Sequence, residues 1–444
     1  MEKLVQVLSI SSINGKVIKM SQQVKVSTVS VIGLGYIGLP TAAMFASRKV
    51  KVIGVDINQH AVDTINQGKI HIVEPELDMI VHSVVTEGFL RATTKPEPAE
   101  AFLIAVPTPF KDDHVPDLVY VQAATESIAP VLKKGDIVIL ESTSPVGTTE
   151  LMLQWLSSAR PDLRFPIAGA DINSIDVNIA YCPERVLPGH VVRELIANDR
   201  VIGGLTEACS KRAAEIYQVF VEGALHFTNA RTAEMAKLTE NSYRDVNIAF
   251  ANELSLICDK LDINVWDLIK LANHHPRVNI LQPGCGVGGH CIAVDPWFIV
   301  DKTPEEARLI RTAREVNDYK PDWVLEKIRT IVSQLIASGR DEASINVAML
   351  GLAFKPNIDD LRESPALHIA KSFSNETRTN LFLVEPNIEV LPKGIANRKL
   401  VTLEDAVSQA DVIVLLVKHQ EFFEVAKMLN NKTILVDAIG IQTT

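Results

Sequence analysis

The sequence predicts an α/β protein in which two doubly wound sheets flank a helical middle domain that opens with one long central helix. Three observations lead to this prediction: strand-like apolar runs alternate with helical segments in the first half, a long helical pattern without proline occupies the middle, and the alternation restarts near residue 347. With 444 residues, the chain is too long for a single hydrophobic core. We expect an N-terminal extension at 1–27 and domains at 28–228, 229–339 and 340–444.

The composition argues against several classes of protein. Hydrophobic residues make up 47% and charged residues 22% of the chain, an ordinary globular balance. The formal net charge is −10 and no Lys/Arg-rich run occurs, which disfavours nucleic acid and anionic membranes as partners. No apolar run approaches the roughly 20 residues of a membrane span. Five cysteines without a C-x-x-C pair predict reduced thiols, no metal site and a cytoplasmic location.

The N-terminal extension is expected to carry no function. Residues 1–19 are mildly apolar but lack the layout of a signal peptide. Met20 opens a short polar lead just before the first predicted strand. We therefore expect residues 1–19 to be disordered or to result from an upstream start-site artefact.

The first domain opens with a dinucleotide-binding pattern. The predicted strand Thr28–Ile32 is followed at once by the G-x-G-x-x-G run Gly33–Gly38, a helix at Leu39–Ser47 and a second strand at Lys51–Val55 that ends in Asp56. In a Rossmann-like domain the glycines permit a tight turn near the pyrophosphate, the helix N-terminus favours its charge, and the acid binds a ribose hydroxyl. The predicted cofactor-binding residues here are Gly33, Gly35, Tyr36, Ile37, Gly38 and Asp56.

The residue after Asp56 bears on cofactor choice. Ile57 stands where an arginine would accommodate a 2′-phosphate, which favours NAD over NADP. A glycine turn between elements that bind no ligand is the less favoured alternative.

Further strands of the parallel type are expected along the first domain, at Ala101–Val106, Ile137–Leu140, Val177–Tyr181 and Arg200–Gly203. Ligands of open α/β sheets bind beyond the carboxyl ends of the strands. Polar residues that follow these strands are therefore placed to line a site, namely Thr108, Thr143, Glu184 and Arg185. Taken singly, each would be equally at home as a solvated loop residue.

The middle of the chain is predicted to begin with a long helix at Thr232–Asp259. Lys237, Asn241 and Arg244 stand at i, i+4 and i+7 and share one stripe of that helix. Such a stripe is either a solvated face or a buried polar stripe that faces a functional site. Further helical segments are expected at Val265–Ala272 and Glu305–Gly339.

The stretch Gly284–Pro296 contains the residues of greatest chemical interest. Four glycines in six residues predict a loop whose backbone can approach a ligand closely, although a glycine-rich turn with two incidental cysteines is the alternative. Cys291 is the favoured nucleophile because it follows the glycines and Asp295 lies four positions on. Cys285 is expected only to pack. Because a thiol with an ordinary pKa is mostly protonated at pH 7, a nearby cation is needed, and Lys237 can supply it.

The last part of the chain repeats the layout of the first without a G-x-G-x-x-G run. Four strands are expected at Val347–Leu350, Leu381–Val384, Val412–Val417 and Ile434–Val436. Lys355 and Arg362 follow the first of them, where a phosphate-bearing ligand would meet the strand ends. The sequence therefore predicts two Rossmann-like domains and two nucleotides bound at once.

Together these motifs resemble the nucleotide-sugar 6-dehydrogenase family, in order from about residue 28 to the end. The motifs are Gly33–Gly38 with Asp56, Glu141–Thr148, Glu234–Asn241, Gly288–Cys291 and Phe354–Arg362. The resemblance implies a four-electron oxidation of a UDP-sugar by two NAD⁺ in sequence, through a thiohemiacetal and a thioester on the cysteine. The runs Pro183–Gly189 and Gly288–Phe298 favour UDP-N-acetylmannosamine as substrate, with UDP-glucose or UDP-N-acetylglucosamine as alternatives. Cys285 departs from the proline expected at its position.

The resemblance also implies roles for individual residues. The catalytic residues would be Cys291, Lys237, Asn241, Asp295 and Glu184. The substrate-binding residues would be Arg185, Val186, Lys237, Asn241, Arg244, His275, Arg277, Gly284 and Lys355. Thr108, Thr143 and Arg362 would contact NAD. Arg277 is expected to enter the neighbouring subunit's site, which implies a homodimer or a larger homo-oligomer.

Two alternatives come from other functional classes. A two-electron β-hydroxyacid dehydrogenase would share the first domain and a helical Lys-x-x-x-Asn, but it would need neither Cys291 nor a third domain. A catalytically silent NAD-binding regulator is disfavoured because Lys237, Asn241, Cys291 and Asp295 are all present.

Overall fold

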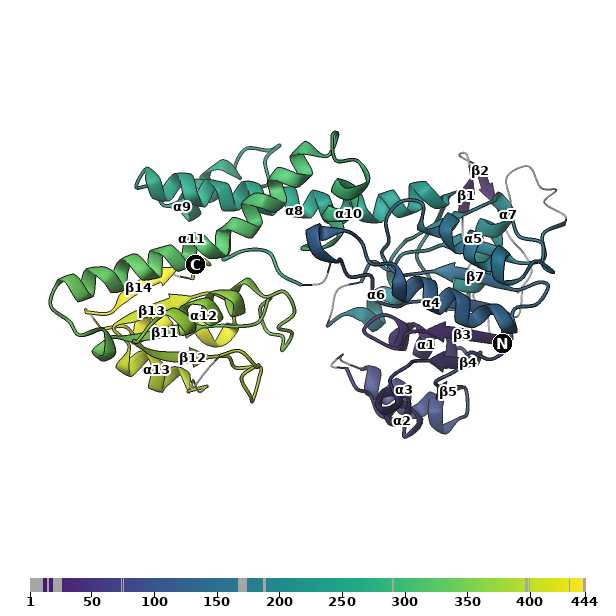
Figure 1. Cartoon of the computed structure of the whole chain (residues 1–444), viewed down its shortest axis with the longest axis horizontal. Helices are drawn as coiled ribbons and strands as arrows, with labels where there is room; N and C mark the ends of the chain where they lie inside the picture. Colours follow the sequence, from purple (N-terminus) through teal and green to yellow (C-terminus); the bar gives the residue numbers. More distant parts are fainter. Residues whose placement is uncertain are drawn as a thin grey trace, which may run out of the picture. The chain divides into compact units, whose positions relative to one another are not determined.

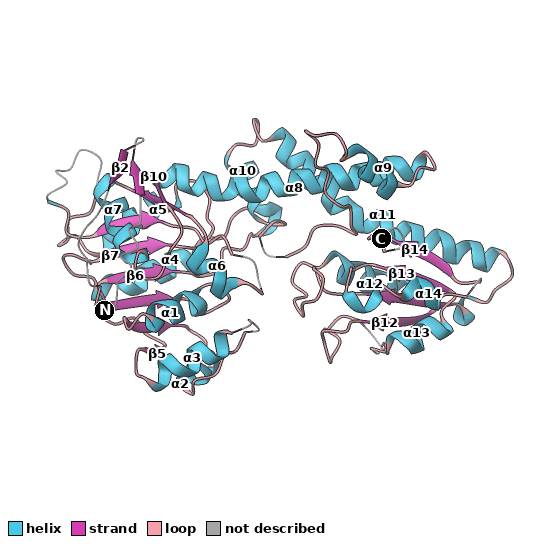
Figure 2. Ribbon diagram, turned by 180° about the vertical axis from the view of Figure 1, so that it is seen from behind, coloured by secondary structure: helices cyan, strands magenta, loops and turns pink. Residues whose placement is uncertain are grey.

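The computed structural model describes residues 11–13, 16–18, 26–72, 74, 76–166, 174–186, 189–289, 291–395, 398, 400–430 and 432–441. The chain divides into two compact units, Met1–Thr239 and Glu240–Thr444, whose elements are labelled in Figure 1 and coloured by type in Figure 2. His290, Leu187 and Pro188, which belong to motifs singled out in the sequence, lie outside the described residues. The domain boundaries proposed at 228 and 339 stay predictions.

The first unit is built on one sheet whose described strands have the order β2-β1-β10-β9-β8-β7-β6-β3-β4-β5. Its strands are β1 (Ser11–Ile13), β2 (Lys16–Ile18), β3 (Thr28–Ile32), β4 (Lys51–Val55), β5 (Leu90–Thr93), β6 (Ala101–Ile104), β7 (Ile137–Leu140), β8 (Asn178–Tyr181), β9 (Arg200–Gly204) and β10 (Leu225–Asn229). The strands predicted from the sequence are all present, and β5 and β10 were not foreseen.

One predicted strand runs in the opposite sense to the expectation. β9 pairs with β8 antiparallel, through Ala180↔Gly204 and Tyr181↔Gly203, although it pairs with β10 parallel. The expectation of parallel strands throughout was therefore wrong at this point. The only helix between β8 and β9 in the described residues is the short α6 (Val191–Ala197). In an antiparallel pair the second strand starts at the edge of the sheet where the first one ends, so a short connection is sufficient.

Helices cover both faces of this sheet. Alternate residues of a strand point to opposite faces, so the partners of neighbouring residues show what packs on each face. In β7, Ile137 and Ile139 belong to one buried apolar cluster, and Val138 and Leu140 belong to the other. The first cluster receives residues of α1 (Gly38–Ser47), α3 (Leu77–Thr86), α6 and α7 (Glu207–Tyr217), and the second receives residues of α4 (Val119–Ile128) and α5 (Thr148–Ala159). A further helix, α2 (Gln59–Asn66), follows β4. The unit is thus doubly wound, as predicted.

The N-terminal extension contains two strands that were not expected. β1 and β2 pair antiparallel through Ser11↔Ile18, and β1 pairs with β10 through Ser12↔His226. Residues 14 and 15, between these two strands, lie outside the described residues. The rest of residues 1–25 lies outside the described residues.

The second unit combines helices with a smaller sheet. Its helices are the part of α8 (Ala230–Lys260) from Glu240 onward, α9 (Val265–Ala272), α10 (Asp295–Lys302), α11 (Arg308–Ala337), α12 (Pro365–Glu376), α13 (Leu403–Gln409) and α14 (Val425–Met428). The sheet has the order β12-β11-β13-β14, with β11 (Asn346–Leu350), β12 (Asn380–Val384), β13 (Val412–Leu415) and β14 (Ile434–Asp437), all parallel.

This smaller sheet is also covered on both faces. Residues of α11 and α12 pack with one side of the strands, and residues of α13 and α14 pack with the other. The long central helix and the four strands predicted for this part of the chain are confirmed. The fold prediction of two Rossmann-like domains with a helical segment between them in the chain is therefore correct.

Candidate active site

The turn after β3 has the backbone geometry of a dinucleotide-binding loop. Gly33 has a φ of +90° and its N–H donates to Val55 O at 2.8 Å. A Cβ on Gly38 would lie 1.8 Å from Gly33 O, so glycine is required there. A Cβ on Gly35 would meet no atom within 4 Å, so this glycine borders open space that a ligand can enter. With the N-terminus of α1 at the end of the turn, the residues present fit NAD.

Asp56 lies where the ribose contact is expected. Its Oδ2 accepts the N–H of Leu34 at 2.9 Å, and its Oδ1 accepts the N–H of Asn58 at 2.9 Å. The carboxylate is only half-buried, so it keeps lone pairs for a ribose hydroxyl. Tyr36 and Ile37, in the same turn, are also half-buried.

The two threonines predicted to line the cofactor site are in contact. Thr108 Oγ1 donates to Thr143 O at 2.5 Å, which joins the segments that follow β6 and β7. The buried carboxylate of Glu234 accepts the N–H groups of Gly147 and Thr149 at 2.7 and 2.8 Å. Glu234 therefore caps the N-terminus of α5 and fixes the start of α8 against the segment that carries Thr143.

Glu184 is not a solvated loop residue. It is 7% exposed, its Oε2 lies 2.8 Å from Arg200 Nη2, and its Oε1 accepts the N–H of Arg185 at 2.7 Å. The Arg200 guanidinium also lies 4.5 Å from the ring centre of Tyr217, whose hydroxyl donates to Glu141 at 2.7 Å. Burial raises the pKa of Glu141 to about 7, although the charge of Arg200 opposes this shift. The structure thus presents Glu184 as an oriented carboxylate in a buried cluster.

Three further predicted residues belong to the first unit. Arg185 Nη1 donates to Asp199 O at 3.2 Å, and Val186 packs against the apolar cluster that includes α1. Lys237 is half-buried on α8. On the same helix Asn241 is buried and Arg244 is exposed, so the polar stripe is neither fully solvated nor fully buried.

The glycines of the loop before Cys291 serve a packing role that the sequence did not indicate. A Cβ on Gly288 would lie 2.4 Å from Glu363 O and 2.8 Å from the Phe354 Cβ, and a Cβ on Gly289 would lie 2.8 Å from the Phe354 ring. Gly286 is similarly close to Pro365. At these three positions the absence of a Cβ lets the segment that follows β11 pack closely, and the expected approach of the loop backbone to a ligand stays a prediction. The N–H of Gly289 donates to Arg362 O at 3.2 Å, which fastens the two segments together.

Cys291 begins the turn that leads into α10. Its carbonyl accepts the N–H groups of Val294 at 3.1 Å and Asp295 at 2.8 Å. The Asp295 side chain is buried and accepts a hydrogen bond from the Asn241 side-chain amide. Of the five cysteines, all within the described residues, only Cys291 is exposed. The structure therefore brings three predicted catalytic residues together: an exposed thiol, a carboxylate close to it in the chain, and an amide that orients the carboxylate.

Cys285 has the packing role that was expected, with one addition. It is 6% exposed and its Sγ donates to Leu416 O at 3.3 Å. Burial raises its pKa to about 12, and the charge of Lys320 opposes this. Lys320 itself is buried, bonds to Ser255 Oγ at 2.5 Å and lies 3.7 Å from the ring centre of Trp323. Burial lowers the pKa of Lys320 to about 7.

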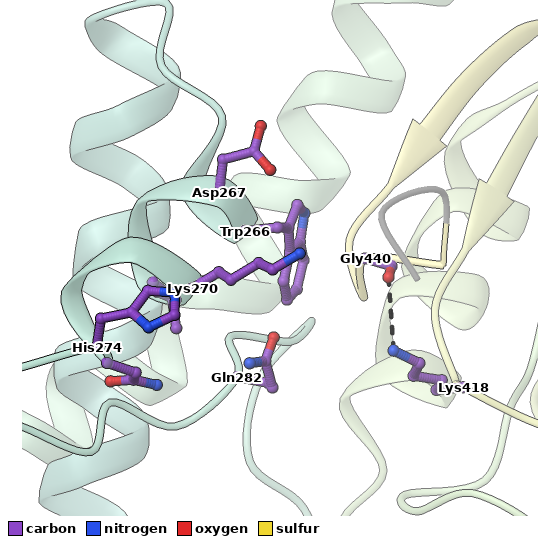
Figure 3. A pocket seen from close by; sticks show the side chains of 9 residues that line it. Trp266, Asp267, Lys270, His274, Gln282, Lys418 and Gly440 are labelled. Carbon is purple, nitrogen blue, oxygen red and sulfur yellow. Dashed lines mark hydrogen bonds between the residues drawn. The ribbon is translucent and has the colours of Figure 1, made fainter.

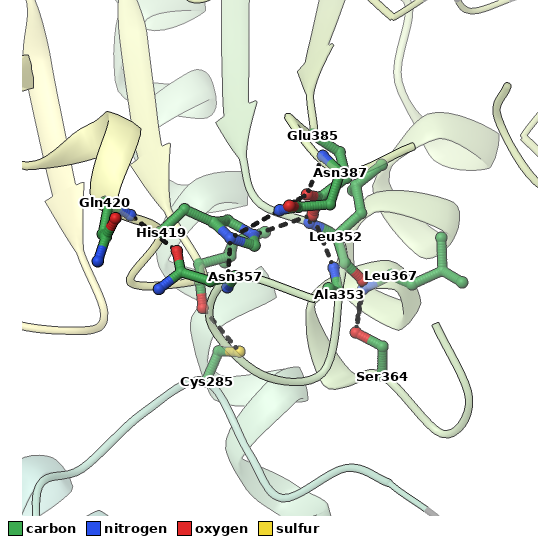
Figure 4. Close-up of polar contacts among 11 residues, drawn as sticks. Cys285, Leu352, Ala353, Asn357, Ser364, Leu367, Glu385, Asn387, His419 and Gln420 are labelled. Atoms are coloured by element: carbon green, nitrogen blue, oxygen red, sulfur yellow. Dashed lines mark hydrogen bonds and ion pairs between the residues drawn. The ribbon is translucent and has the colours of Figure 1, made fainter. Parts of the chain in front are cut away.

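The segment between β11 and α12 carries Lys355 and Arg362. Lys355 is half-buried, and Arg362 is paired with Asp360 at 2.6 Å. The buried pair Glu385–His419 holds the start of this segment. Glu385 Oε2 accepts the N–H of Leu352 at 2.7 Å and lies 3.0 Å from His419 Nε2. Figure 4 shows these contacts and the Cys285 contact beside them.

The remaining predicted residues lie on the surface of the second unit. His275 and Arg277 are exposed, and His275 Nδ1 accepts the Arg277 N–H at 3.3 Å. Gly284 is half-buried and its N–H donates to Asn252 Oδ1 at 2.9 Å.

A groove of about 670 Å³ lies nearby in this unit and contains none of the predicted site residues (Figure 3). Its lining is Trp266, Asp267, Ile269, Lys270, Asn273, His274, Gln282, Lys418 and Gly440. Within the described part of the chain no helix is long and apolar enough to cross a membrane, and no three His, Cys, Asp or Glu side chains are grouped to hold a metal ion.

The sequence reasoning missed Arg200 and Asn252. Arg200 opens a predicted buried strand, and a charged residue at such a position is rarely buried unless it is paired. Asn252 is buried on the long helix, where a polar residue must satisfy both its donor and its acceptor. Either departure from the apolar pattern could have identified these residues.

Comparisons with known proteins agree with these observations. Models of the UDP-glucose/GDP-mannose dehydrogenase family match in order: the NAD binding domain at residues 27–221, the central domain at 231–319 and the UDP binding domain at 348–443.

Individual relatives match over almost the whole chain. The UDP-N-acetyl-D-mannosamine dehydrogenase of Campylobacter jejuni is 63% identical over 401 residues, which are 89% of this chain and 96% of the relative. The NDP-N-acetyl-D-galactosaminuronic acid dehydrogenase of Ralstonia nicotianae is 59% identical over 414 residues, 93% of this chain and 96% of the relative. The solved structure of the UDP-D-ManNAc dehydrogenase of Pyrococcus horikoshii superposes with a TM-score of 0.83 at 38% identity, covering 93% of this chain and 96% of that one. The chain therefore belongs to the UDP-glucose/GDP-mannose dehydrogenase family, with NAD as its cofactor.

Proposed function

We propose that this enzyme oxidises UDP-N-acetyl-D-mannosamine at C6 to UDP-N-acetyl-D-mannosaminuronate, for cell-surface polysaccharide biosynthesis. The observation that carries the proposal is the exposed thiol of Cys291 beside the buried Asn241–Asp295 pair. The sugar is inferred from the similarity to relatives that carry this name at 63% identity. UDP-glucose and UDP-N-acetylglucosamine are the alternative substrates, and the name of the Ralstonia relative adds a galactosamine epimer.

Cys291 would be the nucleophile for the second half of the reaction. NAD⁺, when bound, accepts one hydride at each of two oxidation steps. The thiolate adds to the C6 aldehyde to form a thiohemiacetal, loss of hydride gives the thioester, and attack of water breaks the C–S bond and releases the carboxylate and the thiol. Lys237 and Asn241 would stabilise the oxygen anion at C6, and Asp295 and Glu184 would orient water and take up its proton.

The binding residues would divide between the two ligands. Arg185, Val186, Arg244, His275, Arg277, Gly284 and Lys355 would hold the UDP-sugar, with Lys237 and Asn241 at its reacting end. Gly33, Gly35, Tyr36, Ile37, Gly38, Asp56, Thr108, Thr143 and Arg362 would hold NAD. What supports this division is that Gly33–Gly38, Asp56, Thr108, Thr143, Arg185, Val186, Lys355 and Arg362 all follow the carboxyl ends of strands, where ligands of open α/β sheets bind.

Stoichiometry tests the reaction class. We expect two NADH for each uronate formed and no aldehyde in solution, with UDP-N-acetylmannosamine preferred in a panel that includes the glucose, N-acetylglucosamine and N-acetylgalactosamine analogues. One NADH per turnover with free aldehyde would reject the thioester mechanism.

Two cysteine variants test the nucleophile. Cys291→Ala should abolish uronate formation while UDP-sugar binding survives, because the covalent step is lost and the binding contacts are not. Cys285→Ala is the matched control and should keep most of the rate, since its buried sulfur packs in the apolar cluster of the second unit and donates to Leu416 O. An active Cys291→Ala enzyme beside an inactive Cys285→Ala enzyme would reverse the assignment.

The enzyme is also proposed to work as a homodimer or larger homo-oligomer. An apolar stripe with a seven-residue spacing is exposed on α8, formed by Tyr243, Phe250 and Ile257 at 69%, 51% and 47% exposure. A second copy of the chain is the proposed cover for this stripe.

Mixed oligomers test the proposal that Arg277 enters the neighbouring site. A 1:1 mixture of Cys291→Ala and Arg277→Ala chains, each inactive alone, should regain about one quarter of the activity when subunits exchange. In a mixed dimer, the site of the Arg277→Ala chain combines its own intact Cys291 with the intact Arg277 of the other chain. If Arg277 serves its own chain, the mixture stays inactive.

A cytoplasmic location is the remaining part of the proposal. The five thiols, none of them in a disulfide, support it because thiols persist in a reducing compartment. Recovery of the enzyme in a membrane or secreted fraction would contradict it.

A further inference from the structure

A chain of buried polar side chains runs through the second unit and ends at the loop that carries Cys291. Its members are Arg314 and Asn317 on α11, Asp245 and Asn252 on α8, and the backbone N–H of Gly284. The four residues are between 0% and 1% exposed. None of them belongs to the catalytic or binding residues proposed above, and buried polar groups of this kind must be satisfied by each other.

The hydrogen bonds of this chain have one direction. Arg314 Nη1 donates to Asp245 Oδ1 at 2.7 Å, and Asn317 Nδ2 donates to the same oxygen at 2.8 Å. Asn252 Nδ2 donates to Asn317 Oδ1 at 2.8 Å, and the Gly284 N–H donates to Asn252 Oδ1 at 2.9 Å.

The carboxylate sets this direction. An ionised carboxylate only accepts hydrogen bonds, so Asn317 must turn its NH₂ group toward Asp245 and its oxygen toward Asn252. Asn252 must then donate to Asn317, which leaves its own oxygen for Gly284. A flipped amide at either position would place two donors or two acceptors face to face in a buried site. Through the side-chain amides of Asn317 and Asn252, the charge pair Asp245–Arg314 thus makes the Asn252 oxygen available as the acceptor of the Gly284 N–H.

Gly284 is the first residue of the glycine-rich segment that leads to Cys291. The same segment is attached again at Gly289, through Arg362 O, and Asp295 beyond it is held by Asn241. Without the Asn252 contact, the segment would lose this attachment to α8 at its start, and the half-buried N–H of Gly284 would lose its partner.

We propose that Asn252 is a positioning residue that sets the glycine-rich loop, and with it Cys291, through its hydrogen bond to the Gly284 N–H. The effect of Asn252 on catalysis rests on the proposed function of Cys291, whereas its effect on the loop does not. Asn252 touches no reacting atom in this account. A displacement of the nucleophile by a fraction of an ångström is enough to slow a covalent step considerably.

The test uses the full-length enzyme with three substitutions. Asn252→Leu removes both hydrogen bonds at similar size, Asn317→Leu removes only the group that orients Asn252, and Asn380→Ala is a matched control at an exposed asparagine of β12. The readout is the rate of hydrogen exchange at the Gly284 amide. A general loss of stability would accelerate exchange at other amides as well, whereas loss of the Asn252 contact should accelerate it at Gly284. The Gly289 and Ile280 amides, bonded to Arg362 O and Asn273 Oδ1, serve as internal references.

We expect Gly284 exchange to be at least tenfold faster in Asn252→Leu and about threefold faster in Asn317→Leu, with the two reference amides within twofold of the parent enzyme. The kcat for uronate formation should fall about tenfold in Asn252→Leu, while the Kd for NAD⁺ stays unchanged. Asn380→Ala should match the parent in every measurement. If Asn252→Leu does not fold, the same comparison is made with Asn317→Leu.

Unchanged Gly284 exchange in a folded variant would overturn the proposal, as would equal acceleration at all three amides. Faster Gly284 exchange with an unchanged kcat would also overturn it, because the loop would then move without consequence for Cys291. If Cys291→Ala is active while Gly284 exchange responds as expected, the proposed chemistry fails and the structural contact stands.

Discussion

The crossovers β3-α1-β4 and β11-α12-β12 begin with the same turn in the two units. The acid that follows the second strand, however, has different surroundings in each unit. Gly33 and Gly351 have φ values of +90° and +96°, and each donates its N–H at 2.8 Å to the last residue of the neighbouring strand. The following leucine then donates to a carboxylate, Leu34 to Asp56 at 2.9 Å and Leu352 to Glu385 at 2.7 Å. The backbone of the crossover is therefore shared.

The difference lies in what surrounds the carboxylate. Asp56 is half-buried, the next residue Ile57 is 91% exposed, and Gly35 borders open space. Glu385 is buried and covered by His419, whose Nδ1 accepts the N–H of Asn357 at 2.9 Å.

The connection to the next helix differs as well. In the first unit α1 begins at the last glycine of the turn, whereas in the second unit α12 begins only at Pro365. The same crossover can therefore leave its acid accessible beside the glycine turn or use the acid to support a longer segment, here the one that carries Lys355 and Arg362.

The largest contrast is expected in stability. Glu385→Ala leaves the N–H groups of Leu352 and Ala353 and the ring of His419 without their buried acceptor, so it should lower the free energy of unfolding by about 3–5 kcal/mol. Asp56→Ala should cost about 1 kcal/mol, because water can reach the N–H groups it leaves. Urea unfolding of both variants measures the difference. Equal losses in the free energy of unfolding would show that the two carboxylates contribute equally to stability.

A second contrast concerns the pH dependence of stability. The buried Lys320 of the second unit has its pKa lowered from 10.5 to about 7, so the unfolded chain binds more protons between these values. Its unfavourable contribution is full below pH 7 and is relieved as pH rises toward 10.5, with a slope of up to about 1.4 kcal/mol per pH unit. Lys320→Met should flatten this rise.

Glu141 of the first unit predicts the opposite slope. Its pKa is raised from 4.5 to about 7, so the folded chain binds more protons in that range and stability falls as pH rises from 4.5 to 7. Glu141→Gln should reduce the fall without affecting the rise above pH 7, and the part that remains is expected from Asp136, whose pKa burial raises to about 6. Denaturation at a series of pH values separates the two, and a single slope across the whole range would contradict both assignments.

The smallest expected effect is on cofactor choice. Asp56→Ala should raise the KM for NAD⁺ about tenfold and narrow the preference over NADP⁺, because a carboxylate binds ribose hydroxyls and repels a 2′-phosphate. The comparison of kcat/KM for both cofactors is the measurement. Equal use of NAD⁺ and NADP⁺ by the parent enzyme would show that Asp56 does not meet the ribose.

The sequence was most informative where local pattern and structure coincide. Apolar periodicity and glycine spacing depend on nearby residues alone, and they predicted the helix α8, the turn Gly33–Gly38 and the strands of both sheets except β1, β2, β5 and β10. The Cys291–Asp295 proximity followed from their separation of four residues in a turn.

What could not be predicted depends on contacts between distant segments. The antiparallel direction of β9 is set by pairing with β8, and the role of Gly288 is set by Glu363, 75 positions further along the chain. A domain with the layout of the first was predicted around Gly351, but the hydrogen bond from Leu352 to Glu385 joins residues 33 positions apart and was not foreseen. Arg200 and Asn252 were missed because each is meaningful only beside a partner that the fold supplies.

The tight packing of the glycine-rich loop has a consequence for how homologous sequences can diverge. At Gly289 the obstacle to a larger residue is the ring of Phe354 together with a φ of +84°, so a smaller residue at 354 would relieve only part of it. At Gly288 the obstacle is Glu363 O, a backbone atom that every sequence possesses. Position 288 should therefore remain glycine in any homologue that keeps this fold, whatever sugar it oxidises. Positions 289 and 354 should instead change together, as a pair inherited across two domains of the family.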